Sequence, residues 1–182
     1  SGCVNAKFIQ PYFYMNIYLI GFMAVGKTTL GKRLAKAMDR PFIDTDKLIV
    51  ERTGKSIEEI FETLGEDEFR KIEADTLRSI TATNNVIATG GGLPCYYNNM
   101  DFMNAQGLTI YLNANSAFIY TRLLHAKAPR PLLKELKLDE LLAFIEAKLA
   151  ARQPYYLQSK LVQDMPLKSV ETLVNTIVEQ GL

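Results

Sequence analysis

The chain has 182 residues, 48% of them hydrophobic and 23% charged, which is ordinary for one globular domain with a sizeable core. Its formal net charge of +1 gives no excess of positive charge that would favour nucleic acid or an anionic membrane as a partner. No apolar run has the length that a membrane-spanning helix needs. The two cysteines, Cys3 and Cys95, form no Cys-x-x-Cys motif, and two thiols without a pattern fit a reducing cytoplasm.

The first 14 residues precede Met15 and begin with Ser-Gly, as a remnant of tag removal would. Residues 9–14 are apolar and aromatic, but Pro11 interrupts them and no signal-peptide cleavage site follows. We therefore expect residues 1–14 to be an N-terminal extension or a tag remnant without a role in function. Residues 15–182 contain no repeat or linker, so we expect them to form a single domain.

Strand and helix signals alternate along this domain. An apolar run at 17–20 ends at a glycine and predicts a buried strand, and apolar residues four apart predict a helix at 28–39. Further strands are expected at 41–44, 86–88, 108–112 and from 161, and further helices at 56–64, 69–80, 117–124, 170–178 and from 138 to about 151, ending before Pro154. This alternation predicts an α/β fold with a mainly parallel sheet of about five strands flanked by helices.

Residues 21–28, Gly-Phe-Met-Ala-Val-Gly-Lys-Thr, fit the phosphate-binding motif G-x-x-x-x-G-K-[ST] between a strand and a helix. Glycines let the backbone turn around an anion, and the N–H groups that follow face the phosphates. Lys27 can reach the β- and γ-phosphates, and the Thr28 hydroxyl can coordinate Mg²⁺. ATP and Mg²⁺ are therefore the expected cofactors, and the predicted nucleotide-binding residues of the loop are Gly21, Ala24, Val25, Gly26, Lys27, Thr28 and Thr29. A chance glycine-rich turn is the alternative, which the flanking strand and helix disfavour.

The segments after the loop narrow the class of P-loop protein. We find no Asn-Lys-x-Asp segment that a GTPase would use to read guanine. The strand at 86–88 ends in Thr89 and three glycines instead of the aspartate that regulatory and motor ATPases often carry. Asp44 and Asp46 follow the preceding strand, and ligands of open α/β sheets bind beyond the carboxyl ends of strands. Asp44, Asp46 and residues 90–92 should therefore converge near the P-loop.

Six motifs in this order resemble those of the shikimate kinases. They are G-x-x-x-x-G-K-T at 21–28, Asp-x-Asp at 44–46, Phe-Arg at 69–70, Gly-Gly-Gly at 90–92, Arg-Pro-Leu-Leu at 130–133 and Arg-x-Pro-x-Tyr at 152–156. The resemblance covers almost all of residues 15–182. It implies a P-loop NTPase fold of the nucleoside monophosphate kinase type. It also implies ATP-dependent phosphorylation of the 3-hydroxyl of shikimate, giving 3-phosphoshikimate and ADP, in the route to chorismate and aromatic amino acids. We expect a small-molecule substrate, a monomer and a cytoplasmic location.

The resemblance also implies roles for the two aspartates. Asp44 matches the residue that, together with Thr28, holds Mg²⁺ through its hydration shell. Asp46 matches the residue that hydrogen-bonds the substrate hydroxyls, and it is our candidate for orienting, and even deprotonating, the attacking hydroxyl. The alternative is that either aspartate only caps the following helix, and Asp46 stands well placed for an N-cap.

Arg70 and Arg152 match the family arginines that bind the substrate carboxylate, a task for which the planar guanidinium is suited. The alternative for Arg70 is a solvated charge that pairs with Glu66 or Glu73 on a helix surface. Gly90, Gly91 and Gly92 match the segment that contacts the carboxylate and ring, and their alternative is an ordinary flexible turn.

Arg130 matches the catalytic arginine of a lid, which we expect around residues 122–136 and which would close over the site and exclude water. Together with Lys27 it would stabilise charge on the transferred phosphoryl group. Arg122 is expected to stack on adenine, with a solvated helix arginine as an equal alternative. Ala24 stands where many family loops have glycine. A positive φ there would strain the loop and weaken phosphate binding.

Two other functions remain open at this stage. A gluconate kinase or a nucleoside monophosphate kinase would share the fold, and the order of the motifs is what favours shikimate over gluconate. A nucleotide-dependent switch with slow hydrolysis is the alternative from another class, and no specific motif supports it.

Overall fold

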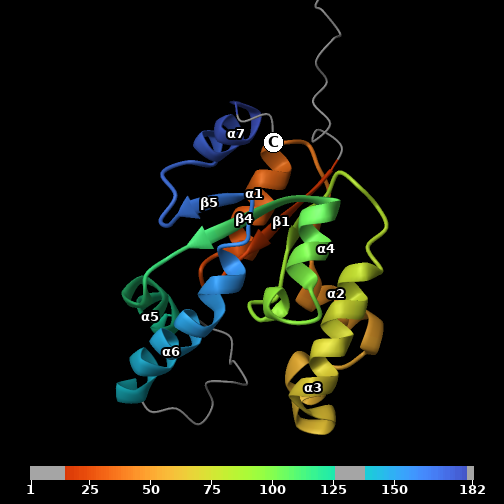
Figure 1. Ribbon diagram of the computed structural model, residues 1–182, viewed down its shortest axis with the longest axis vertical. Helices are drawn as coiled ribbons and strands as arrows, with labels where there is room; N and C mark the ends of the chain where they lie inside the picture. The colour runs from red at the N-terminus through yellow and green to blue at the C-terminus, as the bar shows by residue number, and fades with distance from the viewer. Residues whose placement is uncertain (1–14, 126–137, 180–182) are drawn as a thin grey trace, which may run out of the picture.

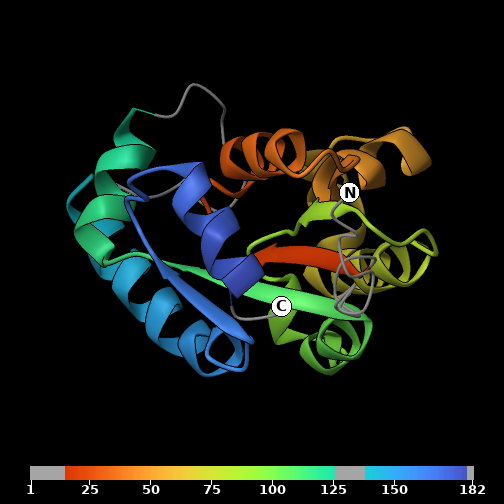
Figure 2. The same ribbon diagram turned by 90° about the horizontal axis from the view of Figure 1, so that it is seen from above.

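The computed structural model describes residues 15–125 and 138–179, and within them a parallel five-stranded sheet lies between two layers of helices (Figures 1 and 2). The strands, in the spatial order β2-β3-β1-β4-β5, are β1 (Asn16–Ile20), β2 (Phe42–Asp44), β3 (Val86–Ala88), β4 (Gly107–Asn113) and β5 (Leu161–Asp164). The helices are α1 (Lys27–Ala37), α2 (Thr45–Thr53), α3 (Ile57–Arg78), α4 (Asn99–Gln106), α5 (Ser116–Leu124), α6 (Leu138–Tyr156) and α7 (Val170–Glu179), with a 3-10 turn, η2 (Leu93–Cys95). The predicted fold class is confirmed.

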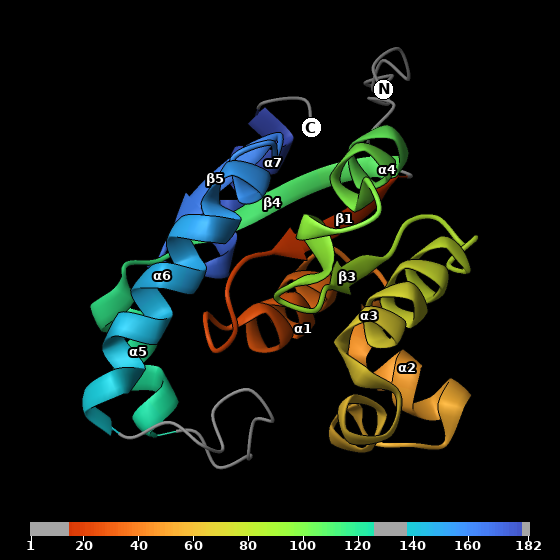
Figure 3. The ribbon, with the colours of Figure 1, turned by 60° about the horizontal axis from the view of Figure 1, so that its bottom comes forward.

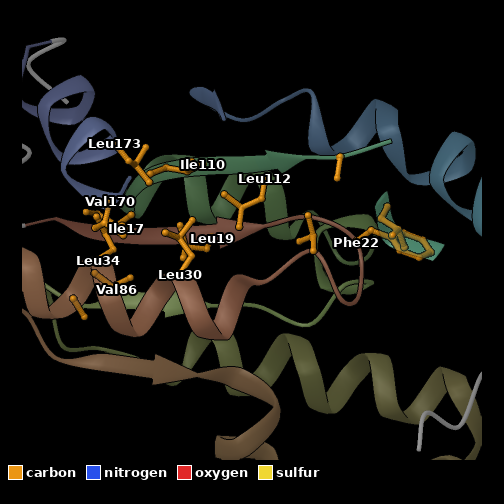
Figure 4. Packing of buried hydrophobic residues seen from close by; sticks show 14 of the residues in the cluster. Ile17, Leu19, Phe22, Leu30, Leu34, Val86, Ile110, Leu112, Val170 and Leu173 are labelled. Carbon is orange, nitrogen blue, oxygen red and sulfur yellow. The ribbon is translucent and has the colours of Figure 1, made fainter. Parts of the chain in front are cut away.

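Both faces of the central strand β1 are buried. Ile17 and Leu19 point to a cluster that includes Leu34 of α1 and residues of α7 (Figure 4), whereas Tyr18 and Ile20 pack with side chains of α3, α4 and the end of α6. This alternation follows from the two-residue period of a strand, and burial on both faces explains why β1 reads as a continuous apolar run. The packing holds the carboxyl end of β1, and hence the loop that follows it, in one place.

The sheet order brings the predicted site residues to one edge. In the parallel pairing, Ala88 of β3 lies opposite both Leu19 of β1 and Asp44 of β2. The loops that leave β1, β2 and β3 therefore begin side by side, with the α2–α3 pair and the α5–α6 pair on either side of them (Figure 3). This edge is where an open α/β sheet binds its ligand.

Residues 56–64 and 69–80 were expected as two helices, and α3 consists of two helical segments that meet at a non-helical kink at Gly65 (φ 80°, ψ 172°). The first segment begins with the predicted Ser56–Glu59 capping box. The bounds of α2 were not predicted, although a helix after the two aspartates was considered. Helix α2 follows β2 without a connecting turn, and Asp44 is both the end of the strand and the helix cap.

The prediction that the helix from 138 ends before Pro154 is wrong. Helix α6 continues to Tyr156 with Pro154 inside it. A proline this near a helix end removes few backbone bonds, and the N–H of Leu157 donates to the carbonyl oxygen of Gln153 at 2.9 Å. The Tyr156 ring is fully buried, with its centre 5.0 Å from the ring of Tyr111, and this contact fixes the last turn on the sheet.

Residues 1–14 and 126–137 lie outside the described residues, so the N-terminal extension, most of the lid and Arg130 stay predictions. Among the helices that the structure describes, none has the length and apolar composition to cross a membrane.

Candidate active site

The P-loop connects β1 to α1 as predicted. Gly21 and Gly26 take φ values of 139° and 109°, which favour glycine and let the loop curl back on itself. The Nζ of Lys27 donates to the carbonyl oxygens of Gly21 (2.7 Å) and Phe22 (2.8 Å), so this largely buried ammonium lies across the loop. Helix α1 has no acidic residue in its first turn, so its positive N-terminal end is open to an anion.

Thr28 and Asp44 form the pair that the prediction assigned to Mg²⁺. The Thr28 hydroxyl donates to Asp44 Oδ2 at 2.8 Å. Asp44 Oδ1 accepts hydrogen bonds from the backbone N–H groups of Asp46 (3.2 Å) and Lys47 (3.4 Å). A hydroxyl beside a carboxylate is a set of hard oxygen ligands that suits Mg²⁺. The capping residue of α2 is thus Asp44, and the expectation that Asp46 is well placed as the N-cap is wrong. Asp46 lies in the first turn of α2.

A cleft of about 260 Å³ lies over the P-loop. It is lined by Met23, Ala24, Gly26, Lys27, Thr28, Thr29, Asp44, Asp46, Thr89, Gly91 and Arg122. The predicted nucleotide, metal and hydroxyl-binding side chains therefore meet around a single opening, although they come from four separate parts of the sequence.

A second pocket of about 200 Å³ lies beside this cleft, and Arg122 lines both. The Nε of Arg122 donates to the carbonyl oxygen of Ala24 at 2.6 Å, and its guanidinium carbon lies 5.5 Å from the centre of the Phe118 ring. Arg122 is exposed but held over the P-loop. Sequence reasoning missed the rest of the pocket, which includes Leu30, Met165, Pro166, Leu167 and Val170. The only sequence feature that could have pointed to this pocket is the short Met-Pro-Leu segment after the last strand.

The three glycines after β3 allow charged side chains to pack closely against the backbone on the substrate side of the site. A Cβ at Gly90 would lie 2.3 Å from Glu73 Oε1 and 2.9 Å from Asp46 Oδ1, and one at Gly92 would lie 2.6 Å from Arg70 Nη1. Larger residues would clash with these charged groups, so the glycines are explained by close approach. The alternative of an ordinary flexible turn does not account for these contacts.

Arg70 is buried, with 4% of its surface exposed, so the solvated charge of the alternative is wrong, although the pairing with Glu66 and Glu73 that it expected is present. Its Nη1 donates to Glu73 Oε2 at 2.6 Å, and its Nε and Nη2 donate to Glu66 Oε1 at 3.2 Å and 2.6 Å. Burial alone would lower the pKa of Arg70, but the two carboxylates raise it above its ordinary value. The guanidinium is thus charged and fixed in orientation.

Arg152 reaches the same region from α6. It is also buried, and its guanidinium carbon lies 5.4 Å from the centre of the Phe22 ring in the P-loop. One turn further on, the Tyr156 hydroxyl donates to the carbonyl oxygen of Gly91 at 2.6 Å. Burial raises the pKa of Cys95 to about 11, although Arg152 and Arg70 both act to lower it. The two predicted carboxylate-binding arginines therefore both lie near Cys95, and Arg70 lies directly against Gly92.

Glu73 is a site residue that sequence reasoning placed only as a surface partner. It is 1% exposed and lies between Arg70 and Gly90. Burial raises the pKa of Glu73 to about 7, because the loss of hydration outweighs the attraction of Arg70, and repulsion from Asp46 adds to the effect. No local signal marks such a residue, because a glutamate at helical spacing from an arginine is common on helix surfaces.

Comparison with known proteins gives consistent results. The model of the shikimate kinase family matches residues 23–181. A shikimate kinase of Bacteroides thetaiotaomicron is 44% identical over 149 residues, which is 81% of this chain and 85% of that relative. The solved structure of a shikimate kinase from Acinetobacter baumannii in complex with shikimate has 30% identity and a TM-score of 0.84, over 92% of this chain and 95% of that one.

The fold alone is shared more widely. A gluconokinase from Sinorhizobium meliloti 1021 covers 93% of this chain and 92% of its own with a TM-score of 0.57, but its sequence identity is 14%. The fold therefore does not separate the two kinds of kinase, whereas sequence similarity over most of the chain does.

Ala24 has φ 60°, the conformation for which strain was expected. We predict that Ala24→Gly raises the free energy of unfolding by up to about 1 kcal/mol, because the strain removed exceeds the freedom added to the unfolded chain. The KM for ATP should fall as well, because the strain at this residue is expected to weaken phosphate binding. Urea unfolding and steady-state kinetics measure both. As a control, Ala37→Gly in the last turn of α1 should destabilise, and a destabilised Ala24→Gly would contradict the prediction.

The raised pKa of Glu73 predicts a pH dependence of stability. The folded protein binds this proton more tightly than the unfolded chain, so the stabilisation is full below pH 4.5 and is lost as the pH rises to about 7. Relative to Glu73→Gln, the free energy of unfolding of the unsubstituted protein should fall by about 1–3 kcal/mol over this window and then level off. Urea unfolding of both proteins at several pH values tests it, and parallel pH profiles would refute it.

Proposed function

The chain belongs to the shikimate kinase family, and we propose that it transfers the γ-phosphoryl group of ATP to the 3-hydroxyl of shikimate, giving 3-phosphoshikimate and ADP, through the residues gathered at this sheet edge. The observation that carries the assignment of residues is the convergence of Arg70, Arg152 and the glycine segment beside a P-loop. Two fixed guanidinium groups next to close-packed glycines suit a flat, carboxylate-bearing acceptor.

ATP and Mg²⁺ are the cofactors of this family. The phosphates lie along the P-loop, where Lys27 and the N-terminus of α1 supply positive charge and N–H donors. The adenine enters the apolar pocket beside Arg122, between α5 and the segment that precedes α7. Thr28 and Asp44 hold Mg²⁺, which when bound neutralises charge on the phosphate oxygens.

The acceptor lies on the other side of the P-loop. Arg70 and Arg152 bind its carboxylate, and Asp46 accepts hydrogen bonds from its hydroxyl groups. A Cβ at Gly90 would lie 2.9 Å from Asp46 Oδ1, so Asp46 reaches the floor on which the acceptor ring rests. These contacts hold the acid end and the hydroxyl end of one small molecule at the same time, which fixes its orientation toward the P-loop.

Catalysis then depends on positioning and electrostatics. Asp46 aligns the attacking hydroxyl with the γ-phosphorus and accepts its proton as the bond forms. Lys27 stabilises the charge on the transferred group. Arg130, which lies outside the described residues, would add a second positive charge when the lid closes, and such arginines contribute on the order of 10³ to 10⁵ in rate in P-loop enzymes.

We further propose that residues 15–182 act as one domain with a lid around 122–136, as a monomer in the cytoplasm. The single continuous sheet and the unpaired, half-buried Cys95 support this reading.

The first test is Mg²⁺-dependent release of ADP from ATP with and without shikimate. We expect shikimate to stimulate release strongly, and gluconate and AMP to leave it near the rate without acceptor. A response to gluconate or AMP instead of shikimate would overturn shikimate as the acceptor but would leave phosphoryl transfer from ATP at the P-loop in place. A response to none of the three would favour a nucleotide-dependent switch.

The second test concerns the carboxylate clamp. Arg70→Lys keeps the charge but loses the planar fork, so the KM for shikimate should rise about 10- to 100-fold while the KM for ATP is retained. Arg78→Lys on the same helix is the matched control, because Arg78 donates to Asn99 and to the carbonyl oxygen of Tyr97, neither of which belongs to the clamp. Unchanged shikimate kinetics in Arg70→Lys, with a normal melting temperature, would remove Arg70 from the clamp.

A further inference from the structure

The side-on edge of the Arg70 guanidinium, formed by Nε and Nη2, is occupied. One oxygen of Glu66 accepts from both Nε and Nη2, and Glu73 accepts one further hydrogen bond from Nη1. Other groups lie close to the guanidinium. A Cβ at Gly92 would lie 2.8 Å from its central carbon, and the centre of the Tyr96 ring lies 4.7 Å from that carbon. A substrate carboxylate that binds Arg70 at the Nε–Nη2 edge must therefore take the place of Glu66.

Of the two carboxylates, Glu66 is the one that can leave. The side chain of Glu73 is 2% exposed and is wedged between Arg70 and Gly90, whereas the side chain of Glu66 is 46% exposed. Glu66 also directly follows Gly65, where the helical backbone is broken. A half-exposed side chain next to a helix break can turn toward solvent without disturbing the core.

The charges around Glu66 are those that a substrate carboxylate would meet. Burial raises the pKa of Glu66, but Arg70, Lys148 and Arg152 together lower it below the ordinary value. The Tyr96 hydroxyl points to the same carboxylate oxygen at 3.5 Å. Glu66 is thus ionised at neutral pH and lies within the field of both clamp arginines.

We propose that Glu66 is an internal competitor for the acceptor's carboxylate, because it occupies the Nε–Nη2 edge of Arg70 and must be displaced when the acceptor binds. The proposal rests on the proposed function. Binding then exchanges one carboxylate for another on the same guanidinium. Since Glu66 is tethered, its effective concentration exceeds that of most free anions. Simple carboxylates therefore bind weakly at Arg70. Only an acid that also contacts Asp46 and the glycine segment displaces Glu66.

The test is Glu66→Gln, which keeps the shape and removes the charge. The KM for shikimate should fall about three- to tenfold, as expected for loss of a partly exposed ion pair that opposes binding, and the KM for ATP should stay unchanged. Calorimetric titration with shikimate should give the same gain in affinity. Acetate, as a probe without hydroxyl groups, should inhibit Glu66→Gln at lower concentration than it inhibits the unsubstituted protein. Glu68→Gln is the control, because Glu68 is an exposed residue of the same helix that pairs with Lys71.

Glu66→Asp, one methylene shorter, should give an intermediate gain and guards against an effect peculiar to glutamine. A higher KM for shikimate in Glu66→Gln would overturn the proposal and would mean that Glu66 supports the clamp. Unchanged affinity for both shikimate and acetate would also overturn it. The proposed function fails by a different result, which is no stimulation of the unsubstituted protein by shikimate.

Discussion

The parallel pairing of β2 with β3 and of β3 with β1 is the constraint on which the site depends. It brings three carboxyl ends to one edge of the sheet, where the P-loop, Asp44 and the glycine segment begin. Burial of β1 on both faces makes this arrangement rigid, because a shift in register would expose apolar side chains on one face. Chemistry that needs ATP and an acceptor in line can be placed here without any long connecting structure.

Around that edge, the protein keeps an unusual number of charges out of water. Arg70, Glu73 and Arg152 are all more than nine-tenths buried, and burying an unpaired ion is very unfavourable. The acidic partners of Arg70 reduce this penalty, and they also hold the guanidinium flat against Gly92. The same pairing creates a conflict with a substrate that carries a carboxylate. A site that must be stable when empty and still bind an anion has to contain a group that gives way.

The fold class and the P-loop were accessible from the sequence, because their signals are local. The P-loop has a fixed spacing between a strand and a helix, and the Ser56–Glu59 capping box lies within four residues. Glu73, the pocket beside Arg122 and the continuation of α6 past Pro154 were not accessible. Each depends on residues that are distant in the chain, such as Gly90 for Glu73 and Tyr111 for the last turn of α6.

By itself, the sequence determined that this protein has a P-loop between a strand and a helix and which family its motifs resemble, because those properties follow from short motifs in a definite order. Only the tertiary structure decided which charges are paired and which are buried. Glu66 lies four residues before Arg70 and Glu73 three residues after it, yet one is half exposed after a helix break and the other is enclosed by the glycine segment. The difference arises from what packs against each side chain, and the spacing of residues along one helix does not predict its contacts with distant segments.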